Sequence, residues 1–187
     1  MLAEYRDVVP LVNNPVGWGE ENVKVFPNEN PWFSEATLSL FEQARQETIR
    51  VRVPMGDTNG PKAALRWLSV HDGNLAVYTD PSEYFVLWGL PHVAPELHQK
   101  ALDDLKTLRS TDIPYGISTH NLILLSPDGS RNPENTSVVA IINNDQHGFA
   151  AGRLSVSYEG MLDPTVDLNP SGVPSTFETV KRTLREE

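Results

Sequence analysis

The stretch that decides the fold class lies near the middle of the chain and has the sequence LRWLSVHDGNLAVYT, residues 65–79. Two apolar runs, Leu65 to Val70 and Leu75 to Thr79, flank a polar centre that contains Asp72 and Gly73. Asp-Gly between two apolar runs is a strong hairpin signal, because both turn residues must adopt a positive φ. The stretch therefore predicts two antiparallel strands joined by a tight turn.

Before this hairpin, the spacing of the apolar residues changes twice along the chain. Val23 to Phe26 predicts a short strand. Ser34 is a favourable N-cap, and the apolar spacing from Thr37 to Gln46 predicts a helix. Thr48 to Val53 then alternates strictly between polar and apolar residues, which predicts a half-buried strand.

Two helices are predicted directly after the hairpin. Asp80 as N-cap and Pro81 as the first helical residue predict a short helix that runs through Leu87. Pro95 to Leu108 carries one apolar stripe of leucine and alanine, which predicts the clearest helix of the chain.

The pattern of apolar and polar residues changes near residue 112. Apolar segments at 115–125, 137–142 and 154–158 predict three strands, of which the first two form a hairpin. A proline-rich loop at 163–174 leads to a helix that Ser175 or Thr176 caps and that continues to the last residue. We therefore expect an α+β protein with an N-terminal α+β region at 1–111 and a second region at 112–187.

The composition narrows the class of function. The chain has 187 residues and a formal net charge of −10, which disfavours a nucleic-acid binder or a protein of anionic membrane surfaces. Cysteine is absent, which removes disulfides, thiolate metal sites and cysteine nucleophiles. No apolar run reaches the roughly 20 residues that span a bilayer, and the N-terminus lacks the pattern of a signal peptide. A cytoplasmic protein is expected.

The last six residues carry the most specific motif, Arg182-Thr183-Leu184-Arg185-Glu186-Glu187. With the strand, strand, strand, loop, helix order before it, this segment resembles the Nudix hydrolase family. The family's box is Gly, five residues, Glu, seven residues, Arg-Glu, an aliphatic, any residue, Glu-Glu, any residue, Gly. Arg182, Leu184, Glu186 and Glu187 match box positions, whereas Thr183 stands at a glutamate position and the Gly-Glu arm has the wrong spacing.

This resemblance implies a mixed-sheet α/β half-domain at 112–187, truncated because the sequence ends inside the box. It implies Glu186 and Glu187 as ligands of Mg²⁺ or Mn²⁺ and Arg182 as the residue that orients the carboxylates. Glu178 lies eight residues before Glu186, about two helical turns, so it projects from a similar face and is the candidate catalytic base or a further ligand. The implied function is hydrolysis of a nucleoside diphosphate linked to another group, by a metal-activated water.

Two alternatives stay open at this point. A catalytically inactive Nudix-like module would bind a nucleotide or a protein partner, as Thr183 suggests. A purely structural domain would leave an incomplete sheet, which a second copy or another chain would complete. His120 has no nucleophile elbow beside it and is interpreted as a packed strand residue.

Overall fold

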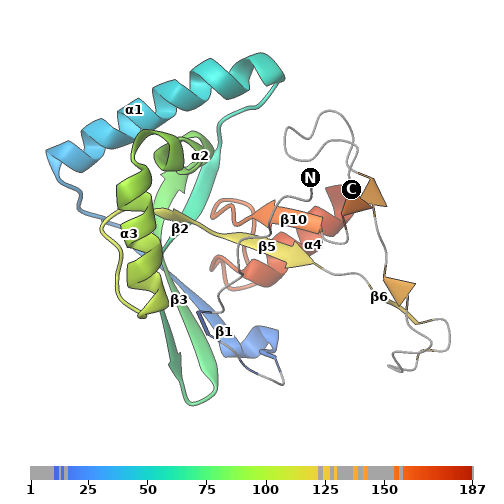
Figure 1. Cartoon of the computed structure of the whole chain (residues 1–187). Coiled ribbons are helices and arrows are strands. Elements are labelled where there is room, and N and C mark those ends of the chain that lie inside the picture. Colours follow the sequence, from blue (N-terminus) through green and yellow to red (C-terminus); the bar gives the residue numbers. More distant parts are fainter. Residues whose placement is uncertain are drawn as a thin grey trace.

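The computed structural model describes residues 11–12, 14, 17–121, 124–126, 129, 137–138, 141–142, 154–155 and 158–186. It confirms an α+β protein. The described residues form four α-helices and a four-stranded mixed sheet, together with three two-stranded pairs (Figure 1). Within the same residues, no helix is both long and apolar enough to cross a membrane.

The main sheet has the strand order β1-β3-β2-β4. β2 (Pro61–His71) and β3 (Asn74–Glu83) form the predicted antiparallel hairpin. Asp72 and Gly73 at its tip have φ values of 48° and 76°, as the Asp-Gly signal requires. β1 (Val23–Pro27) lies parallel to β3 on one edge, and β4 (Tyr115–Gly116) pairs with β2 on the other.

The first helix is longer than the sequence pattern indicates. α1 (Glu35–Arg52) starts after Ser34, whose hydroxyl accepts a hydrogen bond from the Thr37 amide, as expected of the N-cap. The predicted strand from Thr48 to Val53 is wrong, because α1 continues to Arg52 and a short 3₁₀ turn follows at Val53–Met55.

Burial of Thr48 explains why the helix continues. Its hydroxyl donates to the carbonyl oxygen of Ala44 one turn earlier, at 2.9 Å, and lies 2.6 Å from the carbonyl oxygen of Phe85 in α2 (Tyr84–Val93). Gly89 of α2 packs directly on the same turn of α1. Packing against a distant helix therefore decides a segment whose alternation alone favours a strand.

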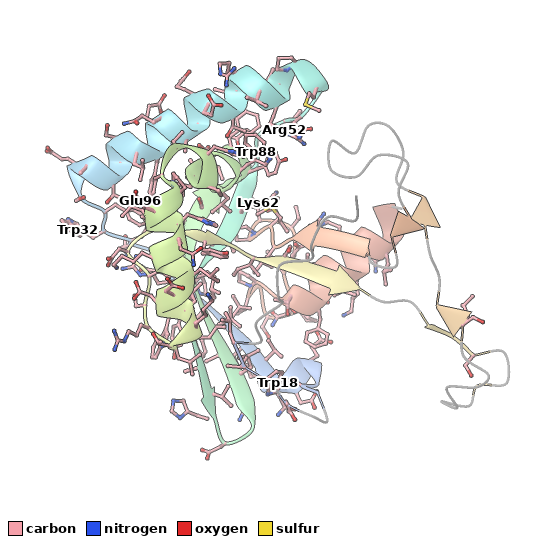
Figure 2. The ribbon with its side chains drawn as sticks, viewed as in Figure 1. Trp18, Trp32, Arg52, Lys62, Trp88 and Glu96 are labelled. Carbon is pink, nitrogen blue, oxygen red and sulfur yellow. The ribbon has the colours of Figure 1, made fainter. Side chains whose placement is uncertain are left out.

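Figure 2 shows the far end of this helix pair. The Arg52 guanidinium lies 5.4 Å from the centre of the Trp88 ring, and its Nε donates to Asp57 at 2.6 Å. Tyr84 also donates to that carboxylate, at 3.0 Å. The contact ties the C-terminal end of α1 to α2 by a charge-assisted hydrogen bond and a cation–π interaction.

The helix start predicted at Asp80 and Pro81 is also wrong, because β3 continues through Glu83 and α2 starts at Tyr84. β1 ends at Pro27, opposite Thr79, so among the described residues no strand pairs with β3 on that side at Pro81. A proline without an N–H is tolerated on such an open edge.

α3 (Pro95–Lys106) confirms the leucine-striped helix, and its Leu105 joins the core of the main sheet. Leu162 enters the same core from the far side of residue 112, and β4 joins the main sheet. The division at residue 112 stays a prediction, although chain on both sides of it contributes to one sheet and one core.

His98 of α3 stacks on Tyr115 of β4, with ring centres 4.6 Å apart. Burial lowers the pKa of His98, because the charged imidazolium would lose its hydration there. Below the ordinary pKa of about 6.5, the unfolded chain binds this proton more readily than the folded one, so folded stability falls as the pH drops. We expect wild type to lose more stability than His98→Phe between pH 7.5 and pH 5.5, measured by urea unfolding. Equal losses in both proteins would contradict this expectation.

The second part of the chain is built around two strands and a helix. β5 (Ser118–Asn121) pairs antiparallel with β10 (Tyr158–Met161), and α4 (Thr176–Glu186) packs against both (Figure 1). The short strands β6 (Leu124–Leu125) and β7 (Ser137–Val138) pair antiparallel, as the predicted hairpin requires. β8 (Ile141–Ile142) pairs with β9 (Leu154–Ser155).

Candidate functional site

The C-terminal helix starts where the sequence predicts it. The Ser175 hydroxyl accepts a hydrogen bond from the Phe177 amide at 3.2 Å, which makes Ser175 the cap of α4. The preceding loop is itself ordered by hydrogen bonds. The Ser175 amide donates to the Asp167 carbonyl oxygen at 2.8 Å, and the Asn169 amide donates to that of Val173 at 2.9 Å.

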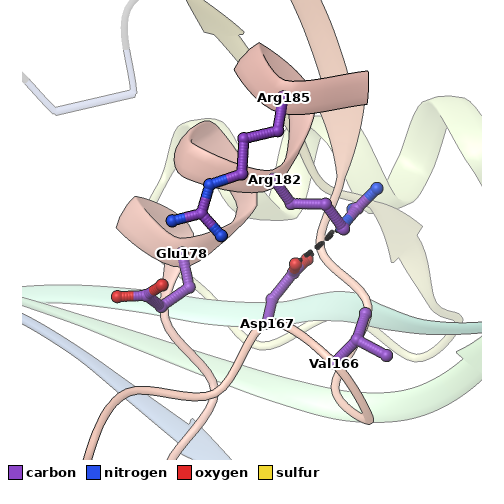
Figure 3. Close-up of a pocket in the computed structure, with 5 residues that line it drawn as sticks. All are labelled: Val166, Asp167, Glu178, Arg182 and Arg185. Carbon is purple, nitrogen blue, oxygen red and sulfur yellow. Dashed lines mark hydrogen bonds and ion pairs between the residues drawn. The ribbon is translucent and has the colours of Figure 1, made fainter.

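A pocket of about 290 Å³ lies between this loop and one face of α4. Figure 3 shows that Glu178, Arg182 and Arg185 reach it from the helix, and that Val166 and Asp167 reach it from the loop. Two of the predicted site residues, Glu178 and Arg182, therefore line one cavity.

Asp167 is the centre of the hydrogen bonding at this pocket and is 1% exposed. Its two carboxylate oxygens accept from Arg182 Nε at 2.7 Å and Nη2 at 3.1 Å. They also accept from the Thr179 hydroxyl and the Asp163 amide, each at 2.9 Å. Four donors thus converge on one buried carboxylate, which is the condition under which a buried charge is stabilised.

Arg182 is consequently held in a fixed position. Besides its two bonds to Asp167, its Nη2 donates to the Met161 carbonyl oxygen at 3.0 Å. A carboxylate that pairs with Arg182, that of Asp167, comes from the loop before α4. The predicted orienting role of Arg182 toward Glu186 and Glu187 stays a prediction, since the Glu186 side chain and Glu187 lie outside the described residues.

Neighbouring Asp163 shows how the loop is tied to the main sheet. Burial disfavours its ionised form, but hydrogen bonds from Thr165 and the Lys62 ammonium outweigh that effect and lower the pKa of Asp163. The Lys62 ammonium of β2 lies 3.5 Å from the carboxylate. The ion pair links the loop beside the pocket to the N-terminal sheet.

Thr183, at a glutamate position of the resembled motif, is buried between α4 and β10. It is 4% exposed, and its hydroxyl donates to the Thr179 carbonyl oxygen at 2.7 Å. Gly160 of β10 packs so closely that a Cβ there would lie 2.2 Å from the Thr183 hydroxyl oxygen. A carboxylate at position 183 would have to enter this contact, so the position does not serve the pocket.

The described residues do not fit a divalent metal. Glu178 is paired with Lys181 at 2.6 Å, and both oxygens of Asp167 are occupied by protein donors. Across the described part of the chain, no three His, Cys, Asp or Glu side chains gather closely enough to hold a metal ion. The predicted Mg²⁺ or Mn²⁺ site at Glu186 and Glu187 stays a prediction, because the Glu186 side chain and Glu187 lie outside the described residues.

Asp167 is not among the site residues predicted from the sequence. The signal that points to it is weak: two aspartates of one loop, Asp163 and Asp167, precede a helix that carries Lys181, Arg182 and Arg185. His120 forms part of β5, opposite Glu159 of β10, and its side chain lies outside the described residues.

Searches of protein-family models, curated proteins and solved structures find no match to this chain.

Proposed function

We propose that this chain is a Nudix-like module that binds a nucleoside diphosphate derivative and does not hydrolyse it. The order of elements before α4 and the matches at Arg182 and Leu184 support the likeness to that family. The burial of Thr183 supports the absence of hydrolysis. This position holds a key carboxylate in the motif, but here it is used for packing between α4 and β10.

The pocket at α4 supports recognition of a diphosphate. Arg182 and Arg185 bring two positive charges to it, and the Arg185 guanidinium can pair with phosphate oxygens in a bidentate geometry. Lys181 offsets the charge of Glu178 at the rim. Asp167 fixes Arg182 before any ligand arrives, which reduces the conformational entropy lost on binding.

The first test is calorimetric titration with ADP-ribose, a nucleoside diphosphate linked to a sugar. Arg185→Gln should weaken binding about tenfold, since one charge-assisted hydrogen bond contributes roughly 1.5–3 kcal/mol and 1.4 kcal/mol is a factor of ten. Arg50→Gln is the matched control, because Arg50 is an exposed arginine of α1 paired only with Glu47 among the described residues. Inorganic pyrophosphate should compete with ADP-ribose. Absence of binding, or equal affinity in wild type and Arg185→Gln, would overturn the proposed site.

Hydrolysis is the second candidate, and the position of Glu178 at the pocket favours it. Incubation of ADP-ribose with the protein and Mg²⁺ or Mn²⁺, followed by chromatography, separates the two functions. Release of AMP that is lost in the double variant Glu186→Gln, Glu187→Gln would establish the hydrolase and refute the non-hydrolysing module. Unchanged ADP-ribose that still binds is the outcome we expect.

A further inference from the structure

A row of three aromatic side chains crosses the main sheet on one face. Phe26, Tyr78 and Trp67 are direct cross-strand neighbours on β1, β3 and β2. The ring centres of Phe26 and Tyr78 are 5.1 Å apart and those of Tyr78 and Trp67 are 4.6 Å apart, with interplanar angles of 19° in both pairs. Because side chains alternate along a strand, this row lies on the face opposite the buried Val25, Val77 and Leu68.

The row is held in place at one end and open at the other. The Trp67 indole N–H donates to the Leu108 carbonyl oxygen at 2.8 Å, just beyond α3. Tyr78 has a stacked ring on each side. Phe26 lies on the edge strand and is 46% exposed. A further planar ring can therefore stack at the Phe26 end of the row, where an aromatic pair contributes about 0.5–1.5 kcal/mol beyond its burial.

A polar cluster stands beside the row. Asp80 is 2% exposed and accepts from Asn28 Nδ2 at 2.9 Å and from Arg66 Nη1 at 3.2 Å. Arg66 Nε donates to the Ser110 hydroxyl at 3.0 Å. The buried carboxylate thus orients the Arg66 guanidinium, whose side chain remains 32% exposed.

Arg66 retains donors for a ligand. A guanidinium has five N–H donors, and the contacts within the described part of the chain use two of them. Three donors remain, in the fork geometry that matches a phosphate or carboxylate.

The aromatic row and Arg66 line one pocket of about 270 Å³, which we name the aromatic pocket. It shares no lining residue with the pocket at α4. Phe26 and Arg66 lie on strands that are two positions apart in the sheet, a spacing of about 10 Å. A ligand that uses both must carry its planar ring and its anionic group at separate ends.

We propose that the aromatic pocket binds a nucleoside monophosphate, with the base stacked on Phe26 and the phosphate bound by Arg66. The separation between the two contacts selects a mononucleotide over a simple aromatic carboxylate, whose charge lies directly beside its ring. This site is independent of the function proposed for α4, because it uses other residues and another ligand.

The test is titration of the full chain with AMP, followed by calorimetry and by tryptophan fluorescence. Wild type should bind AMP at least tenfold more tightly than adenosine or inorganic phosphate, since each of these makes only one of the two contacts. Phe26→Ala and Arg66→Gln should each weaken AMP binding about tenfold. Trp32→Ala and Arg50→Gln are the matched controls, because Trp32 is 82% exposed and does not line the pocket, and Arg50 is an exposed arginine of α1.

Arg66→Lys separates a binding defect from a folding defect. It keeps the positive charge beside Asp80 but lacks the paired N–H donors of a guanidinium. It should retain the thermal stability of wild type while still weakening AMP binding. Arg185→Gln should leave AMP binding unchanged, which separates this site from the pocket at α4. No AMP binding by wild type, equal affinity for AMP and adenosine, or unaltered binding in Phe26→Ala would overturn the proposal.

Discussion

Replacement of Gly89 by alanine should lower the free energy of unfolding by about 3 kcal/mol, the upper part of the range for overpacked cores. A Cβ at position 89 would lie 2.1 Å from the Ala44 carbonyl oxygen, 2.6 Å from its carbonyl carbon and 2.7 Å from the Thr48 hydroxyl oxygen. The first two atoms belong to the backbone of α1, so no side-chain rotation relieves the clash. Alanine favours a helix over glycine by about 1 kcal/mol, which is too little to offset it.

Urea unfolding followed by circular dichroism measures this effect. Gly60→Ala is the matched control, because a Cβ there would meet only the Lys62 ammonium nitrogen, at 3.8 Å. We expect the control to differ from wild type by less than about 0.5 kcal/mol. Wild-type stability in Gly89→Ala would mean that α1 and α2 do not approach as closely as the structure shows.

Replacement of Asp167 by asparagine should lower the free energy of unfolding by about 3 kcal/mol, the scale for breaking a buried ion pair by changing one partner. Among the described residues, each hydrogen-bond partner of the Asp167 carboxylate is a donor. An asparagine side chain replaces one accepting oxygen by an NH₂ group, which faces these donors and cannot accept from them. It also removes the negative charge that balances Arg182. We expect the exposed part of the Arg182 side chain, 29%, to moderate the loss through hydration.

A double-mutant cycle with Arg182→Gln isolates the pair. The two single variants should together lose more stability than the double variant, with a coupling energy above about 1 kcal/mol. Asp112→Asn is the control, since Asp112 is 82% exposed and its ion pair with Lys100 lies at the surface, where such pairs contribute little. Additive losses would show that Asp167 and Arg182 do not stabilise each other.

The parts of the fold that were predicted from sequence are those that local chemistry determines. The β2–β3 turn was predicted because Asp72 and Gly73 tolerate the left-handed conformation that the turn imposes. α3 and the start of α4 follow from an apolar stripe and a serine cap. In each case the deciding residues lie within a few positions of one another.

The wrong predictions concern segments whose structure depends on residues far away in the sequence. Thr48 belongs to a helix because Gly89, some forty positions later, lets α2 approach it. Asp80 resembles a helix cap, but its carboxylate bonds to Arg66 of β2 and to Asn28, the residue after β1. The residues of the candidate site fall into the same two groups, those predicted from local sequence and those that depend on distant contacts. Glu178 and Arg182 were found through a helical motif, whereas Asp167 depends on a loop that folds back fifteen positions along the chain.

The parallel pairing of β1 with β3 has a consequence for the order of folding. Each residue of β1 faces one 52 positions later, as Val23 faces Leu75, and all of α1 lies in the intervening chain. Closing so long a loop costs entropy before any contact compensates for it, so such pairs form late. The β2–β3 hairpin can form within microseconds, with Tyr78 already beside Trp67. Phe26 arrives only when β1 docks, and the aromatic pocket is therefore complete only at the end of folding.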